Sequence, residues 1–77
     1  MKKEYIDVIT KYTSVGEIIP LSIIWNDGRT FTVDKVIDIR RAASLKVGGQ
    51  GVRYTCRISG KEKYMWLEDG KWFVEAL

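Results

Sequence analysis

Residues 18–41 read IIPLSIIWNDGRTFTVDKVIDIRR, and this stretch decides the fold. Two β-branched runs flank Asp27-Gly28, and an Asp-Gly pair in that setting is the strongest short-range signal of a β-hairpin. Gly28 supplies the positive φ that a tight turn requires, and Asp27 tolerates it. The sequence therefore predicts two antiparallel strands, at 18–25 and from 29 to 41.

Both of these strands contain a residue that distorts a regular ladder. Pro20 has no N–H to donate, so its strand must lie at an edge or bend at that point. In an unbroken following strand, Lys35 would lie between Val33 and Ile37 on the buried face. A bulge near Asp34-Lys35 avoids this and also bends the strand as a small barrel requires.

Further strands are predicted at 5–12, 52–59, 62–68 and 71–76, with a second Asp-Gly turn at 69–70. In the first of these we expect Ile6 and Val8 to face inward, because the opposite face is more polar. The alternation in 52–59 is the cleanest in the chain and places Cys56 on an apolar face. Cys56 is therefore expected to be buried and inert.

The segment 42–51 breaks the strand pattern, because three glycines lie in four residues near its end. This composition predicts a mobile loop, after one helical turn at 42–46. With 77 residues the chain forms one domain, 1–77. The expected fold is all-β: a small antiparallel meander of five to six strands that curls into a barrel.

In the number and spacing of its strands, nearly the whole chain resembles the SH3-like barrels. The acidic and aromatic ligand-loop motifs of true SH3 domains are missing, so the resemblance implies no proline-rich ligand. The turn at 25–28, Arg40-Arg41 and Trp72-Phe73 also resemble small bacterial proteins with no assigned activity. That resemblance transfers no site residue.

Composition argues against several classes of function. The chain has one Cys and no His, which excludes an internal disulfide and the Ser-His and Cys-His dyads, and argues against a typical zinc site. We therefore expect no enzymatic activity, no cofactor and no metal. No apolar run approaches the ~20 residues of a membrane helix, and the N-terminus lacks the apolar region of a signal peptide. A cytoplasmic location without a membrane partner is expected.

The net charge of +3 is unevenly distributed. The segment 39–61 contains six basic residues and no Asp or Glu, whereas the rest of the chain has seven basic and ten acidic residues. A block of one sign in a small domain indicates a surface of positive potential. The six residues of this basic block are Arg40, Arg41, Lys46, Arg53, Arg57 and Lys61.

Arginines in this block are predicted to lie on two paired strands, with Lys46 in the loop between them. Such a hairpin gathers positive charge, and Arg binds phosphate groups in bidentate fashion. The candidate anion-binding or nucleic-acid-binding residues are Arg40, Arg41, Lys46, Arg53 and Arg57. Tyr64 and Trp66 share a strand face with two glutamates, so they are candidate exposed aromatics for base stacking or for a protein contact.

Two functions remain open from the sequence. The first is a non-enzymatic binding module whose basic hairpin contacts nucleic acid or an acidic protein. The alternative is a small structural or interaction protein, in the form of a homodimer, that binds through aromatic strand faces. Salt-sensitive retention on an anionic resin favours the first function, and a concentration-dependent mass favours the second. The same charges also have an explanation without a ligand: the basic hairpin only keeps the protein soluble.

Overall fold

A computed structural model describes residues 2–44 and 48–76, with side chains described for 3–41 and 51–75. It confirms the all-β class, and the described residues form seven antiparallel strands and no helix. The strands are β1 (Lys2–Tyr5), β2 (Asp7–Tyr12), β3 (Ile18–Ile24), β4 (Thr30–Ser44), β5 (Gly48–Ile58), β6 (Lys61–Glu68) and β7 (Lys71–Ala76). None of the described residues belongs to a helix that is long and apolar enough to cross a membrane.

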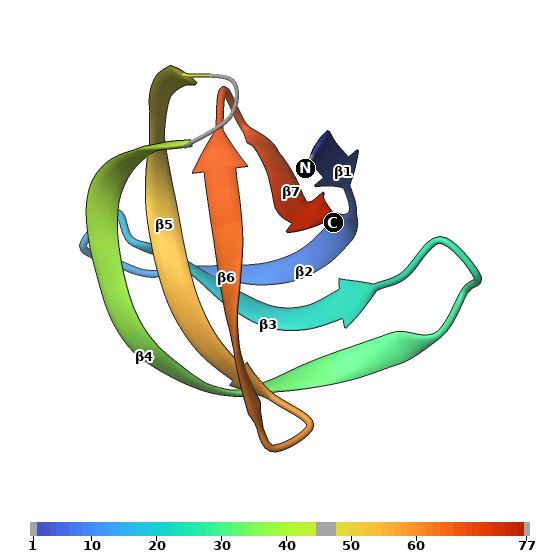
Figure 1. Ribbon diagram of the computed structural model, residues 1–77. Coiled ribbons are helices and arrows are strands. Elements are labelled where there is room, and N and C mark those ends of the chain that lie inside the picture. Colours follow the sequence, from blue (N-terminus) through green and yellow to red (C-terminus); the bar gives the residue numbers. More distant parts are fainter. Residues whose placement is uncertain (1, 45–47, 77) are drawn as a thin grey trace.

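The strands form one sheet in the order β1-β7-β6-β5-β4-β3-β2. Successive strands from β2 to β7 are neighbours, so the chain is a meander that curls into a half-barrel (Figure 1). Only Ile6 separates β1 from β2, although these strands lie at opposite ends of the sheet. The Ile6 amide donates to the Trp72 carbonyl at 3.1 Å, so the N-terminal segment links the two ends.

The expected number of five to six strands was too low, because β1 was not predicted as a separate strand. The helical turn predicted at 42–46 is also wrong for 42–44, because β4 continues to Ser44. Residues 45–47 lie outside the described part of the chain. A long β-hairpin thus replaces most of the expected loop, because main-chain pairing with β5 extends beyond the strongly apolar residues.

The turn and bulge predictions are confirmed. Gly28 has a φ of +89°, and its amide donates to the Trp25 carbonyl at 2.9 Å. The β4–β5 register shifts between Val33 and Lys35, as expected, and it shifts again between Val36 and Asp38. These shifts let Val33 and Val36 pack against the core while Lys35 stays exposed.

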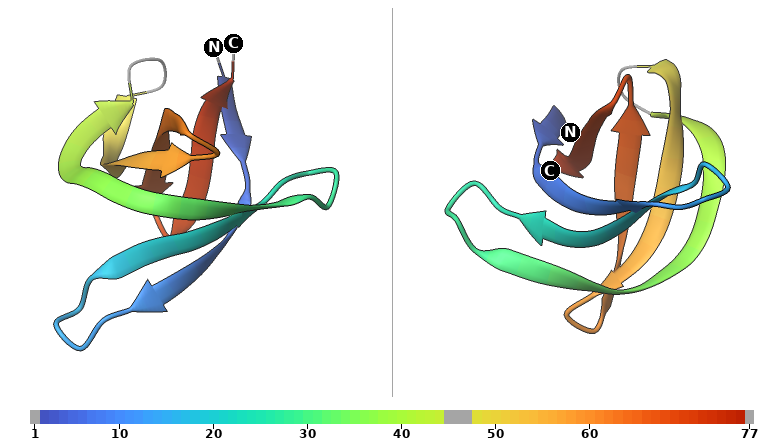
Figure 2. Two further views of the ribbon diagram at one scale, coloured as in Figure 1. Left: turned by 90° about the horizontal axis from the view of Figure 1, so that it is seen from below. Right: turned by 180° about the vertical axis from the view of Figure 1, so that it is seen from behind.

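The main core lies between the two layers of the curled sheet, with β2 and β3 behind β5 and β6 (Figures 1 and 2). Its buried members are Ile6, Ile23, Tyr54, Cys56, Ile58, Met65 and Trp72. The prediction of a buried Cys56 is confirmed, as is the inward orientation of Ile6. We call the sheet face that carries Cys56 and Met65 the inner face, and the opposite one the outer face.

Candidate functional site

The outer face of β4, β5 and β6 brings basic and aromatic side chains together in three cross-strand rows. Residues directly opposite each other on paired strands project to the same side of a sheet, so the register defines these rows. The rows are Lys35–Arg57–Glu62, Asp38–Thr55–Tyr64 and Arg40–Arg53–Trp66. We call this surface the three-row face.

Arg53 and Tyr64 form the centre of the three-row face. The guanidinium carbon of Arg53 lies 4.5 Å from the centroid of the Tyr64 ring, within the range of a cation–π contact. Tyr64 is 55% exposed, so its ring remains accessible beside the arginine. Arg53 is half-buried, and its Nε is a buried donor without a hydrogen-bond partner.

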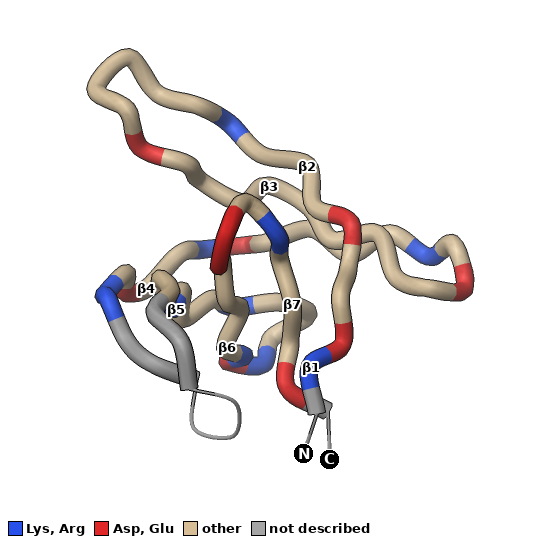
Figure 3. Tube along the Cα trace, turned by 90° about the horizontal axis from the view of Figure 1, so that it is seen from above, with Lys and Arg blue, Asp and Glu red and all other residues tan. Residues whose placement is uncertain are grey.

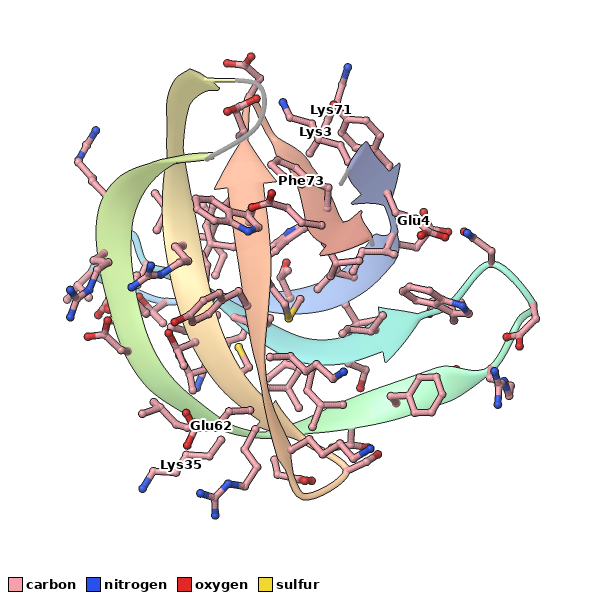
Figure 4. The ribbon with its side chains drawn as sticks, in the orientation of Figure 1. Lys3, Glu4, Lys35, Glu62, Lys71 and Phe73 are labelled. Carbon is pink, nitrogen blue, oxygen red and sulfur yellow. The ribbon has the colours of Figure 1, made fainter. Side chains whose placement is uncertain are left out.

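The other charges of the three-row face are exposed. Arg40 Nε donates to Asp38 Oδ2 at 2.7 Å, and this hydrogen bond raises the pKa of Arg40. Arg57 is exposed and lies between Lys35 and Glu62 in its row. Figure 4 shows Lys35 and Glu62 at the lower end of the sheet. Figure 3 shows acidic positions among the basic ones along β4 and β6. The face is therefore a mixed surface with a positive balance.

The structure brings together three of the five candidate anion-binding residues: Arg40, Arg53 and Arg57. Arg41 is opposite Val52, so it projects from the other face of the hairpin. Lys46 lies outside the described residues. Lys35 belongs to the three-row face although it precedes the basic block, because the bulge after Val33 places it opposite Arg57. The bulge predicted from the sequence was the signal that could have identified Lys35.

The two candidate aromatic residues differ in accessibility. Tyr64 is exposed, as predicted, whereas Trp66 is only 4% exposed and cannot offer its ring to a ligand. The Trp66 ring stacks on Phe73, with centroids 6.1 Å apart and planes 6° apart. Phe73 is fully buried beneath Tyr5 and Lys3, whose Nζ lies 4.7 Å above the Phe73 ring. A second apolar cluster on the outer face therefore takes Trp66 out of the binding surface.

Groups for covalent or metal chemistry are scarce. Burial raises the pKa of the Cys56 thiol to about 11, which suppresses the thiolate at neutral pH. Within 2–44 and 48–76, no three His, Cys, Asp or Glu side chains are grouped so that they could hold a metal ion. The arrangement offers contacts for a ligand more readily than groups for a reaction.

An apolar groove adjoins the three-row face. It has a volume of about 1040 Å³ and extends from the β3–β4 hairpin past β6 to the outer face. Arg53 and Tyr64 line its outer side, and Trp25, Phe31 and Met65 line its inner side. The sequence did not predict this groove. Comparisons of the chain with protein-family models, curated proteins and solved structures gave no match, so the functional assignment depends on this geometry.

Proposed function

We propose that this chain is a non-enzymatic binding module whose three-row face holds single-stranded nucleic acid. The observation that carries the proposal is the contact between Arg53 and the exposed ring of Tyr64. Unstacked bases bind to aromatic rings and arginine planes, and backbone phosphates bind to the cations around them. Both kinds of contact are offered by one strand face.

Charge supports the same proposal. The three-row face has four basic residues and two acidic ones, so its net charge is +2, whereas the chain outside the basic block is net negative. The ion pair of Arg40 with Asp38 is exposed, and exposed ion pairs contribute only about 0–1 kcal/mol. A phosphate can therefore compete with Asp38 for the guanidinium.

Binding of this kind should be weak and nearly independent of sequence, because phosphate contacts position a strand without reading its bases. If three side chains each neutralise one phosphate, log affinity should fall against log salt with a slope of about −2. The test is a titration of a labelled oligothymidylate of about 12 nucleotides at roughly 50 mM and 200 mM salt.

Matched variants separate the contributions of charge and stacking. Arg40→Ser with Arg57→Ser should reduce the salt slope to about −0.7, because two phosphate contacts are lost. Tyr64→Ser should weaken binding at both salt concentrations by about 1 kcal/mol or more, because a stacking platform is lost. The control, Lys11→Ser with Arg41→Ser, removes the same charge from other surfaces and should change the slope little.

Absence of binding by the wild-type protein at low salt would eliminate the nucleic-acid proposal. Equal losses in the Arg40/Arg57 variant and in the Lys11/Arg41 control would show that net charge, not the three-row face, attracts the oligonucleotide. Retention of an acidic protein segment instead of the oligonucleotide would assign the face to the acidic-partner alternative.

A further inference from the structure

Half of β6 has no neighbouring strand on one side. β5 pairs with Lys61 to Leu67, but β7 pairs with β6 only at 66–68. Beyond Phe73, β7 pairs with β1 and leaves β6. Among the described residues, 61–65 therefore form a free strand edge whose main-chain N–H and C=O groups on that side meet no other strand.

The apolar groove opens beside this free edge. The apolar side chains along the groove are Ile23, Trp25, Phe31, Ile58, Met65 and Val74. Its volume of about 1040 Å³ is slightly above the range for ligand pockets, roughly 300–1,000 Å³. A free strand edge beside a hydrophobic groove is the arrangement by which sheets take up an extended peptide as an additional strand.

The charges at the free edge restrict the occupant. Lys61 and Lys63 alternate with Glu62 along β6, so they share the inner side with Met65 and line the groove. Neither lysine belongs to an ion pair within the described part of the chain. Lysines on an edge disfavour basic or wholly apolar strands. They favour a strand that places acidic side chains opposite them.

A second copy of this chain fits the free edge poorly. A symmetric antiparallel pair of β6 edges that is centred on Lys63 places the two Lys63 residues opposite each other. A pair centred on Glu62 opposes two Glu62 residues and places Lys61 against Lys63. Like charges directly opposite each other destabilise a strand pair. A pair centred on Tyr64 extends only over 63–65, because β7 already pairs with Trp66 on that side. The occupant is therefore a different chain.

We propose that the free edge at 61–65 binds an extended, acidic segment of another protein, which adds antiparallel to β6. Inward-pointing residues of this segment alternate with outward-pointing ones. One apolar side chain lies opposite Met65 and enters the groove beside Trp25, and acidic side chains lie opposite Lys63 and Lys61. The site adjoins the proposed nucleic-acid contact, which uses the outer side of β4 to β6, but the peptide uses the free edge and the inner side of β6.

The test uses the peptide Ser-Phe-Thr-Glu-Thr-Glu-Ser, which places Phe opposite Met65 and its two Glu residues opposite the two lysines. Titration into ¹⁵N-labelled protein should shift the amide signals of 61–65 and the indole signal of Trp25. Replacing Phe by Ala in the peptide should weaken binding several-fold, because apolar burial is lost. Replacing both Glu residues by Lys should abolish binding.

A charge exchange provides the decisive comparison. Lys63→Glu should weaken binding of the acidic peptide roughly fivefold and partly restore binding of the Lys-substituted peptide. The control variant Lys11→Glu makes the same exchange at an exposed position on β2 and should leave both affinities unchanged. A variant that had lost its fold could not gain affinity for the Lys-substituted peptide, so unfolding cannot explain this result.

Several results would overturn the proposal. They are no shift at about 1 mM peptide, shifts confined to β4 and β5, and equal binding of the acidic and basic peptides. A dimer in sedimentation that shields the amides of 61–65 would assign the edge to a second copy. Oligothymidylate is titrated separately, so failure of the peptide and failure of the nucleic-acid proposal are distinguishable.

Discussion

The two halves of β6 differ in pairing, although they belong to one continuous strand. Residues 66 and 67 pair with β5 on one side and with β7 on the other, whereas 61–65 pair only with β5. Residues 61–64 are exposed, and Met65 and Trp66 are buried. The difference arises because β7 leaves β6 beyond Phe73 and pairs with β1 instead. Residues 61–65 are therefore left without a neighbouring strand on that side. The closed half is covered on both sides, and the open half leaves one strand edge free.

The largest expected effect is on the aromatic cluster of the closed half. Phe73→Ala should lower the free energy of unfolding by about 3–5 kcal/mol, because Phe73 is fully buried against Trp66 and Tyr5. Phe31→Ala, in the half-buried wall of the groove, should lower it by less than about 2 kcal/mol. Urea unfolding of both variants measures the difference, and equal losses would remove the distinction between the two halves.

Amide exchange should separate the two halves along one strand. Amides of 61–65 that point away from β5 have no acceptor strand, so they should exchange orders of magnitude faster than their neighbours that point toward β5. At 66 and 67 both directions meet a strand, and this alternation should disappear. Uniform protection from 61 to 68 would indicate that the free edge is covered in solution.

The ionisation of Cys56 measures how well the core beneath the open half of β6 excludes water, because Cys56 lies opposite Lys63. Its pKa of about 11 in the folded protein exceeds the ordinary value of 9.0, so the folded state retains the thiol proton longer than the unfolded state. Stability is therefore unaffected below pH 9 and should fall between pH 9 and 11, by roughly 1–3 kcal/mol.

Burial also raises the pKa of Tyr54, and this contributes to the same decline. Cys56→Ala should lower stability at pH 7 but reduce the additional loss above pH 9. Urea midpoints at pH 7, 9 and 10.5 measure both effects. Parallel pH profiles for the two proteins would indicate that water reaches the thiol in the folded state.

The smallest expected effect concerns the contact between β1 and the closed half. Lys3 Nζ lies 2.6 Å from Glu68 Oε1, and this hydrogen bond raises the pKa of Lys3. Lys3→Met keeps most of the apolar stem over Phe73 and removes the charge, so it should lower Tm only slightly. The difference from wild type should shrink as salt is added. A large loss at all salt concentrations would indicate that the charge of Lys3 is shielded from solvent in its contacts with Glu68 and Phe73.

The sequence by itself determined the local features of this protein. Asp27-Gly28 and Asp69-Gly70 form turns, the strand after the first turn has a bulge, and Cys56 faces the core. Turn chemistry and two-residue alternation depend on neighbours along the chain, so they can be interpreted without a partner strand. The all-β class and the meander followed from them.

Only the tertiary structure decided which surfaces are closed and which are open. Trp66 is buried because Phe73 and Tyr5, far apart in the sequence, meet on the outer face. Arg40 and Arg41 project from opposite faces because neighbouring residues in a strand alternate, but the register of the long hairpin decided that Arg40 joins the three-row face. The run Lys61-Glu62-Lys63, polar on both faces of a strand, was the one local sign of a free edge. The groove beside the free edge exists because β7 pairs with β1. This long-range pairing depends on how the whole sheet closes, and no local pattern of residues specifies that.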